Sequence, residues 1–99
     1  PVQARILTIA EKHHEYAREV ADLLRRRGLR VETDLRSEKI GYKIREAQVQ
    51  KVPYMLVIGD NEMAQKTVAV RSRRDGDRGA MDVDALARDL VQEVDARAR

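Results

Sequence analysis

Residues 34–46 gather the side chains most suited to holding a polyanion. Four basic residues lie there within ten positions: Arg36, Lys39, Lys43 and Arg45. The segment follows a strand-like run at residues 29–33, so that a strand end opens into a basic helical turn. Because cationic groups and a helix start both attract anions, the segment predicts a phosphate-binding surface.

A second group of side chains, Glu62 and Arg71, is of the kind that reads unpaired nucleobases. Glu62 comes shortly after the apolar run at residues 54–58, and Arg71 ends the next strand-like run, at residues 66–71. A carboxylate accepts hydrogen bonds from the N1–H and N2–H₂ edge of guanine, and a guanidinium donates to base oxygens or stacks on a base. The spacing is also consistent with a surface ion pair between Glu62 and Arg71, so both interpretations stay open.

Other chemistries find little support in the sequence. His13 and His14 are adjacent at a helix start, where they cannot both face one metal ion, and the chain has no Cys. The sequence contains neither the glycine-rich loops that hold nucleotides nor the nucleophile elbow of hydrolases. With no convergent acid, base or nucleophile, a small stand-alone enzyme is the weakest interpretation.

Charge is distributed unevenly along the 99 residues, a length typical of one domain. Residues 36–51 and 66–79 each hold five basic and two acidic side chains, whereas residues 82–99 hold three basic and five acidic ones. Basic segments of this kind fit a nucleic-acid partner, and a solvated charged surface is the simpler alternative. No apolar run approaches the roughly 20 residues of a membrane span, and the absence of Cys favours the cytoplasm. A chain that begins with Pro1 is expected to be a piece of a longer protein or a processed one.

The hydrophobic pattern predicts a three-layer-like α/β domain with a mixed sheet of four or five strands and three helices. Short β-branched runs indicate buried strands, and apolar residues at spacings of three and four indicate helices. The expected order is strand 5–10, helix 14–27, strand 29–33, helix 37–50, strand 54–58, strand 66–71, short strand 80–83 and a final helix. Residues 59–61 are expected to form a turn, and residues 75–79 a loop.

Helix ends and faces can be predicted as well. Ser37 is expected to cap the second helix, and Asp82 or Asp84 the last one. The inward face of the second helix is expected to hold Ile40, Ile44 and Ala47.

Four stretches together resemble the C-terminal anticodon-binding domain of bacterial threonyl-tRNA synthetase. They are DLRSEKIGYKIRE at residues 34–46, VPYMLVIGDNE at 52–62, VAVRSR at 68–73 and GAMDV at 79–83. Each stretch alone is a weak signal, but their order and spacing are specific, and the resemblance covers the whole chain. The synthetases for Pro, Gly and His, also of class IIa, have related domains that match less well. An accessory protein-interaction module on the same fold is a further alternative.

The resemblance implies a non-catalytic domain, without a cofactor of its own, that binds the anticodon stem-loop of tRNA(Thr). Its other partner would be the rest of a cytoplasmic, homodimeric threonine–tRNA ligase that serves protein biosynthesis and has no membrane partner. That parent enzyme is expected to use ATP and Mg²⁺, with a zinc ion in its distant catalytic core. Threonine anticodons share a central G followed by U, and the domain is expected to read these bases.

Roles for individual residues follow from the same resemblance. Glu62 would accept hydrogen bonds from the central G, and Arg71 would donate to a neighbouring base. Lys39 and Ser37 lie where the family contacts the last anticodon base. Contacts to the RNA backbone, or stacking, would come from Arg36, Tyr42, Lys43, Arg45, Lys51, Asn61 and Arg73.

Three of these positions carry a qualification. Ser37 stands where bacterial members carry Asn, and a hydroxyl makes fewer directional hydrogen bonds than an amide. Asn61 stands where Lys is common before the Glu, which removes one phosphate contact. Tyr42 occupies an aromatic position of the family, for which buried packing is favoured over stacking on a base.

Overall fold

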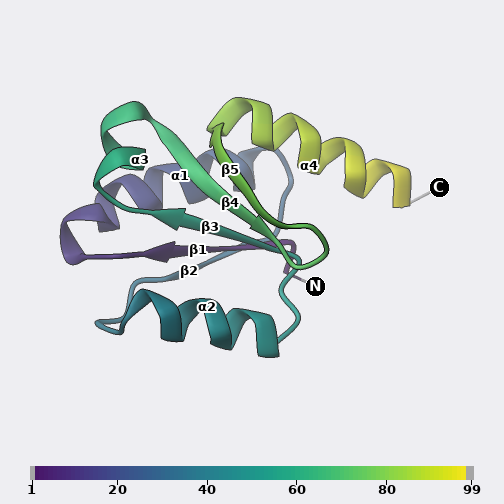
Figure 1. Cartoon of the computed structure of the whole chain (residues 1–99). Helices are drawn as coiled ribbons and strands as arrows, with labels where there is room; N and C mark the ends of the chain where they lie inside the picture. Colours follow the sequence, from purple (N-terminus) through teal and green to yellow (C-terminus); the bar gives the residue numbers. More distant parts are fainter. Residues whose placement is uncertain (1, 98–99) are drawn as a thin grey trace.

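The structure, a computed structural model that describes residues 2–97, is built on one mixed β-sheet (Figure 1). Its five strands lie in the order β2-β1-β3-β4-β5. Their bounds are β1 (Ala4–Thr8), β2 (Val31–Asp34), β3 (Tyr54–Ile58), β4 (Thr67–Ser72) and β5 (Gly76–Asp82). β1 is parallel to both β2 and β3, whereas β4 is antiparallel to β3 and β5. The carboxyl ends of β1, β2 and β3 therefore meet at one end of the sheet.

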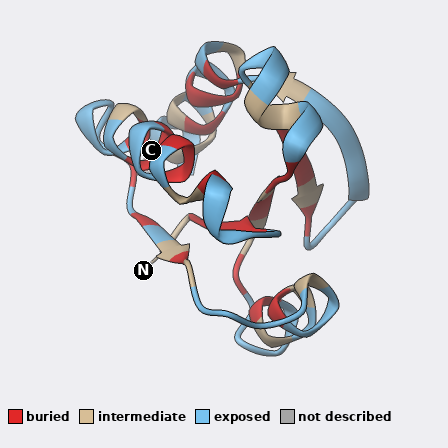
Figure 2. Ribbon diagram, turned by 90° about the vertical axis from the view of Figure 1, so that its left-hand side faces the viewer, coloured by how far each residue is buried: buried red, intermediate tan, exposed pale blue. Residues whose placement is uncertain are grey.

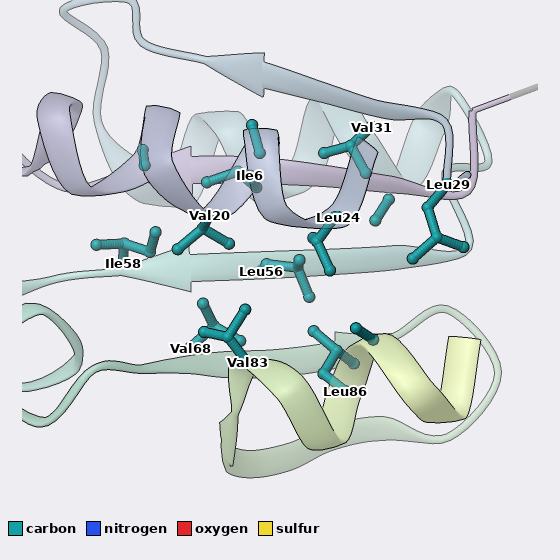
Figure 3. Packing of buried hydrophobic residues seen from close by; sticks show 14 of the residues in the cluster. Ile6, Val20, Leu24, Leu29, Val31, Leu56, Ile58, Val68, Val83 and Leu86 are labelled. Carbon is teal, nitrogen blue, oxygen red and sulfur yellow. The ribbon is translucent and has the colours of Figure 1, made fainter. Parts of the chain in front are cut away.

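Helices cover both faces of the sheet and make three layers. α1 (His14–Arg26) and α4 (Val83–Arg97) pack on one face, where the larger apolar cluster lies (Figure 3). α2 (Ile40–Val49) packs on the opposite face, mainly against β1 (Figure 1). A 3₁₀ turn, η1 (Glu11–His13), leads into α1, and the short α3 (Asp60–Gln65) follows β3. None of the helices within residues 2–97 is long and apolar enough to span a bilayer.

One half of the α2 face of the sheet stays accessible. Val68 and Val70 of β4 are fully buried in the cluster under α1 and α4. Because side chains alternate along a strand, Ala69 and Arg71 face the α2 side, where both are half-buried. β5 is exposed nearly throughout (Figure 2). The α2 side of β4 and β5 is therefore open to a partner.

The predicted fold class, an α/β domain with a mixed sheet, is confirmed, but two segments fold differently from expectation. Residues 59–61 begin α3 instead of a turn, because Glu62 Oε1 accepts a hydrogen bond from the Gly59 N–H at 2.8 Å and caps the helix. The chain thus has four α-helices within residues 2–97 rather than three. Residues 76–79 belong to β5 rather than to a loop, since Gly76 and Gly79 adopt positive φ angles of 76° and 77° that let the strand continue past an irregularity in its pairing with β4.

The start of α2 also differs from expectation. The helix begins at Ile40, with Lys39 at the extended N-cap position, so Ser37 does not cap it. The expected inward residues Ile40, Ile44 and Ala47 do pack toward the sheet, Ala47 fully buried and the two isoleucines partly. Lys43 joins them as an unexpected buried residue of this face. At α4, the two open alternatives are resolved: Asp82 Oδ2 accepts from the Ala85 N–H at 3.1 Å and caps the helix.

Candidate functional site

A pocket of about 600 Å³ opens at the carboxyl ends of β1 and β2, and we call it the strand-end pocket. One wall is the β1–α1 connection, with Ile9 and Glu11. The other wall is the β2–α2 loop, with Ser37 and Lys39, and Lys43 lies beneath. Segments distant in sequence meet here because β1 and β2 are parallel neighbours whose following loops leave the sheet at the same end.

Lys43 forms the floor of this pocket and is almost completely buried, with 1% of its surface exposed. Its Nζ donates to the carbonyl oxygens of Thr8 at 2.9 Å and Asp34 at 3.1 Å, and lies 3.4 Å from Thr8 Oγ1. Burial lowers the pKa of this ammonium group. All three of its N–H groups are thereby occupied by the ends of β1 and β2. The geometry differs from the expectation that Lys43 holds phosphates or sugars, because its charge faces the protein.

Arg36 sits beside the strand-end pocket and is bound by two carboxylates. Its Nε and Nη2 donate to the two oxygens of Asp34 at 2.9 and 2.8 Å, and Nη2 also reaches Glu46 Oε1 at 2.6 Å. Hydrogen bonds from Arg36 hold the pKa of the Asp34 carboxyl below its ordinary value, against a smaller opposing effect of burial. The positive charge of Arg36 is therefore largely neutralised within the protein.

Tyr42 lies on the outer side of α2 and half of its surface is exposed. The guanidinium of Arg36 lies 5.8 Å from the centroid of its ring, within the range of a cation–π contact. Burial of Tyr42, the alternative favoured from the sequence, is therefore wrong. Its ring is accessible, with one face already occupied by Arg36.

The remaining basic and polar residues around α2 point to solvent. Ser37 and Lys39 are exposed at the rim of the strand-end pocket, and no hydrogen bond of their side chains occurs within residues 2–97. Arg45 is exposed on the solvent side of the helix. These three side chains are available to an external ligand.

Glu62 is the third residue of α3, directly beyond the end of β3. Its Oε1 accepts from the Gly59 N–H, and within residues 2–97 its Oε2 takes part in no hydrogen bond. A methyl group on Gly59 would lie 2.7 Å from Ile9 Cδ1 and 3.2 Å from Glu62 Oε1, so the backbone passes close to both side chains. Asn61, the preceding residue, is exposed.

Arg71 lies further along the sheet than Glu62. It pairs with Met55 near the start of β3, whereas Glu62 follows Ile58 at the end of that strand. At 3.3 Å per residue, the three positions from Met55 to Ile58 place Arg71 about 10 Å along the sheet from the end of β3. Glu62 and Arg71 form no ion pair within the described part of the chain, so the ion-pair alternative left open by the sequence is wrong.

A second, basic groove of about 720 Å³ lies at the opposite end of the sheet, and we call it the amino-end groove. Lys51, Arg73 and Arg74 line it, and all three are exposed. Glu93 on its α4 side is already engaged, since it accepts from the Tyr54 hydroxyl at 2.5 Å and from Arg97 at 2.8 Å. Its uncommitted charge is therefore mainly positive.

The two adjacent histidines are separated by the fold. His13 is buried and contacts Asp60 at 2.7 Å, while His14 lies at the strand-end pocket. Within residues 2–97, no group of three or more His, Cys, Asp or Glu side chains is arranged to hold a metal ion. The contact between His13 and Asp60 was not predicted, and the only signal for it is that both residues directly follow parallel, neighbouring strands.

Exposed basic side chains at both ends of a mixed sheet are typical of an α/β domain with a nucleic-acid partner. A family model described as "Anticodon binding domain" matches residues 3–93. The chain therefore belongs to the anticodon-binding domain family.

Within that family the chain is most similar to the threonyl type. It is 60% identical over 94 residues to the threonine–tRNA ligase of Acetivibrio thermocellus. The aligned region covers 95% of this chain and 15% of that relative. The chain thus spans about 15% of the length of the curated relatives it matches.

Solved structures agree with this assignment. The RNA-binding domain of threonyl-tRNA synthetase from Cryptosporidium parvum Iowa II superposes with a TM-score of 0.88 and 39% identity, over 93% of this chain and 23% of that one. Prolyl-tRNA synthetase from Cryptosporidium parvum follows with a TM-score of 0.85 and 25% identity, over 98% of this chain and 22% of that one. The fold is shared among these class II synthetases, while the sequence identity favours the threonyl type.

Proposed function

We propose that this chain binds the anticodon stem-loop of tRNA(Thr) and reads its central G and following U, as the non-catalytic C-terminal domain of a threonine–tRNA ligase. The observation that carries the proposal is the position of Glu62. Its Oε1 is fixed on the Gly59 N–H, close to Ile9 of the strand-end pocket wall, and its Oε2 is uncommitted within residues 2–97. A fixed acceptor next to a pocket large enough for an unstacked base is the arrangement needed to read a guanine edge.

Each candidate residue contributes according to its place. Glu62 accepts from N1–H and N2–H₂ of the central G, chiefly through Oε2. Ser37 and Lys39, at the rim of the strand-end pocket, donate to the oxygens of the following U. Arg71, about 10 Å along the sheet, donates to a neighbouring base or stacks on it.

Backbone contacts come from the exposed basic residues. Among the candidates for backbone contacts, Arg45, Lys51 and Arg73 face solvent with no carboxylate bound to them within residues 2–97. Arg36 offers less charge, because Asp34 and Glu46 bind it, and Lys43 offers none to the outside. Tyr42 presents one ring face for stacking, and Asn61, exposed next to Glu62, contacts the RNA backbone.

The larger protein, in this proposal, attaches threonine to its tRNA with ATP and Mg²⁺, and holds a zinc ion in a catalytic core outside this chain. It works in the cytoplasm as a homodimer. The chain described here supplies the contact with the anticodon and touches no reacting atom.

The proposal is tested with fluorescence anisotropy on two labelled stem-loops that differ only at the central anticodon base, G or A. We expect tighter binding of the G-containing RNA, and Glu62→Ala should remove about 1–3 kcal/mol of that preference, the scale of one good base contact. Arg45→Ala is the matched control, because loss of a phosphate contact weakens both RNAs alike. Equal affinity of the wild-type chain for the two RNAs would overturn the proposal.

A further inference from the structure

The β1–α1 connection is tied to the start of α3 by contacts that the sequence pattern does not reveal. The backbone N–H of Ile9 donates to the carbonyl of Ile58 at 3.1 Å. His13 Nε2 lies 2.7 Å from Oδ1 of Asp60, which is the first residue of α3. Lys12 Nζ adds an exposed ion pair to the same carboxylate at 3.1 Å. Two connections that follow parallel strands β1 and β3 are therefore held together at their tips.

His13 is the buried partner in this tie, with 2% of its surface exposed and both ring nitrogens in use. The Ala10 N–H donates to Nδ1 at 3.1 Å, which requires an unprotonated Nδ1. Nε2 then carries the proton and donates it to Asp60. Because the buried ring makes the hydrogen bonds to Ala10 and to Asp60 in a single orientation, it fixes the position of the Asp60 carboxylate.

α3 depends on such contacts for the position of its start, because its apolar contact with the core is made by Met63, which is only partly buried and lies at the fourth position of the helix. The helix has six residues, all described by the structure, and none of them is buried. A helix this short is not stable by itself. Its start is placed by the bond from His13 to Asp60 and by the Glu62 carboxylate on the Gly59 N–H. Only one residue, Asn61, separates Asp60 from Glu62, so a displaced Asp60 would displace the Glu62 carboxylate as well.

We propose that His13 is a positioning residue for base recognition, acting through Asp60 to set the orientation of the Glu62 carboxylate. The inference rests on the proposed function, since it takes Glu62 as the reader of the central base. His13 itself does not touch the RNA: its ring is enclosed between η1 and α3, and its effect is carried by the protein.

Four variants separate this role from a merely structural one. Asp60→Ala removes the contact between His13 and Asp60. Because 67% of the Asp60 side chain is accessible, the fold should tolerate this substitution. His13→Leu fills the same space without hydrogen bonds. His13→Gln is the conservative variant, because an amide can accept from Ala10 and donate to Asp60. Lys12→Ala is the matched control, since it removes the exposed ion pair to Asp60 and leaves His13 in place.

The readout is the ratio of affinities for the stem-loops with central G and central A. Asp60→Ala and His13→Leu should lower that ratio by about three- to tenfold, the size of coupling between neighbouring residues, while affinity for the A-containing RNA stays unchanged. His13→Gln and Lys12→Ala should keep the wild-type ratio. In the Glu62→Ala background, Asp60→Ala should cause no further loss.

A second measurement needs no RNA. The Gly59 amide donates to Glu62 Oε1, so its resonance in a ¹⁵N–¹H spectrum reports where that carboxylate lies. It should shift in Asp60→Ala and in His13→Leu, and not in Lys12→Ala. A folded Asp60→Ala variant with wild-type discrimination and an unshifted Gly59 resonance would overturn the inference. It would also be overturned if the double variant Asp60→Ala, Glu62→Ala lost as much discrimination as the two single variants together. If Glu62→Ala leaves discrimination intact, the proposed function fails instead, and the Gly59 resonance still decides whether His13 positions the carboxylate.

Discussion

Lys43→Met distinguishes a residue that holds the fold together from one that binds RNA. Methionine has a similar length but no donor, so the carbonyls of Thr8 and Asp34 lose the ammonium group that bonds them. An acceptor left unpaired in the interior costs about 1–3 kcal/mol, and the Asp34 carbonyl keeps a weak bond from the Thr8 hydroxyl at 3.4 Å. Removing the buried charge recovers part of the cost, and we expect a net loss of about 2–4 kcal/mol.

The assay is unfolding in urea and on heating, followed by circular dichroism. For a domain of this size each kcal/mol lowers Tm by about 4–8 °C, so Lys43→Met should melt about 10–30 °C below wild type. Arg45→Ala, two residues further along the same helix but on its exposed side, is the matched control. Its stability should stay within about 0.5 kcal/mol of wild type.

The salt dependence of RNA binding should respond to the control variant Arg45→Ala and not to Lys43→Met. Arg45→Ala should reduce the slope of log affinity against log salt by about one phosphate contact, whereas Lys43→Met, measured where it is folded, should leave the slope unchanged. A Lys43→Met variant with wild-type stability and a reduced slope would refute the reasoning, because it would show that the ammonium group faces the RNA in solution.

Two further predictions concern pH. Burial raises the pKa of Tyr16 to about 12 from its ordinary value of 10.0, so the stabilisation of its neutral form is complete below about pH 10 and is lost as the pH rises towards 12. The free energy of unfolding should fall by about 2–3 kcal/mol over that window. In Tyr16→Phe, urea titrations at alkaline pH should show a free energy of unfolding that depends less on pH. At the acid end, hydrogen bonds from Arg36 lower the pKa of Asp34, so stability is present above the unfolded value of 3.8 and is lost as the pH falls through the lower folded value. Arg36→Gln should make unfolding near pH 3 less dependent on pH, and an unchanged acid transition would contradict the pairing.

The elements that follow hydrophobic pattern were predictable, and those that depend on single polar contacts were not. β3 and α1 follow from apolar periodicity, because their buried residues pack in the core. α3 was missed because none of its residues is fully buried, Met63 being only partly covered by the core. It is started by Glu62 bonding to Gly59, a capping pattern that short polar segments share with turns. β5 was read in part as a loop, because Gly76 and Gly79 are usual loop residues and only the pairing with β4 shows that they serve a strand.

The site was predictable by residue type but not by side-chain direction. The helical spacing that puts Ile40 and Ala47 inward also puts Lys43 on the same face, three residues after one and four before the other. Lysine is rarely buried, so composition favours the exposed alternative. What decides the outcome is that the amino group reaches the carbonyls at the ends of two parallel strands, and that geometry exists only after β1 and β2 pair.

Charge in the segment 34–46 is therefore divided between two tasks. Of its four basic residues, Lys43 and Arg36 are bonded within the protein, the first to strand-end carbonyls and the second to two carboxylates. Lys39 and Arg45 remain exposed. A count of basic residues thus overstates the phosphate contacts that this segment can make. Its internal pairs instead hold the loop that carries Ser37 and Lys39. In the function that we propose, a loop held in this way lowers the entropy lost when the two exposed side chains contact a base.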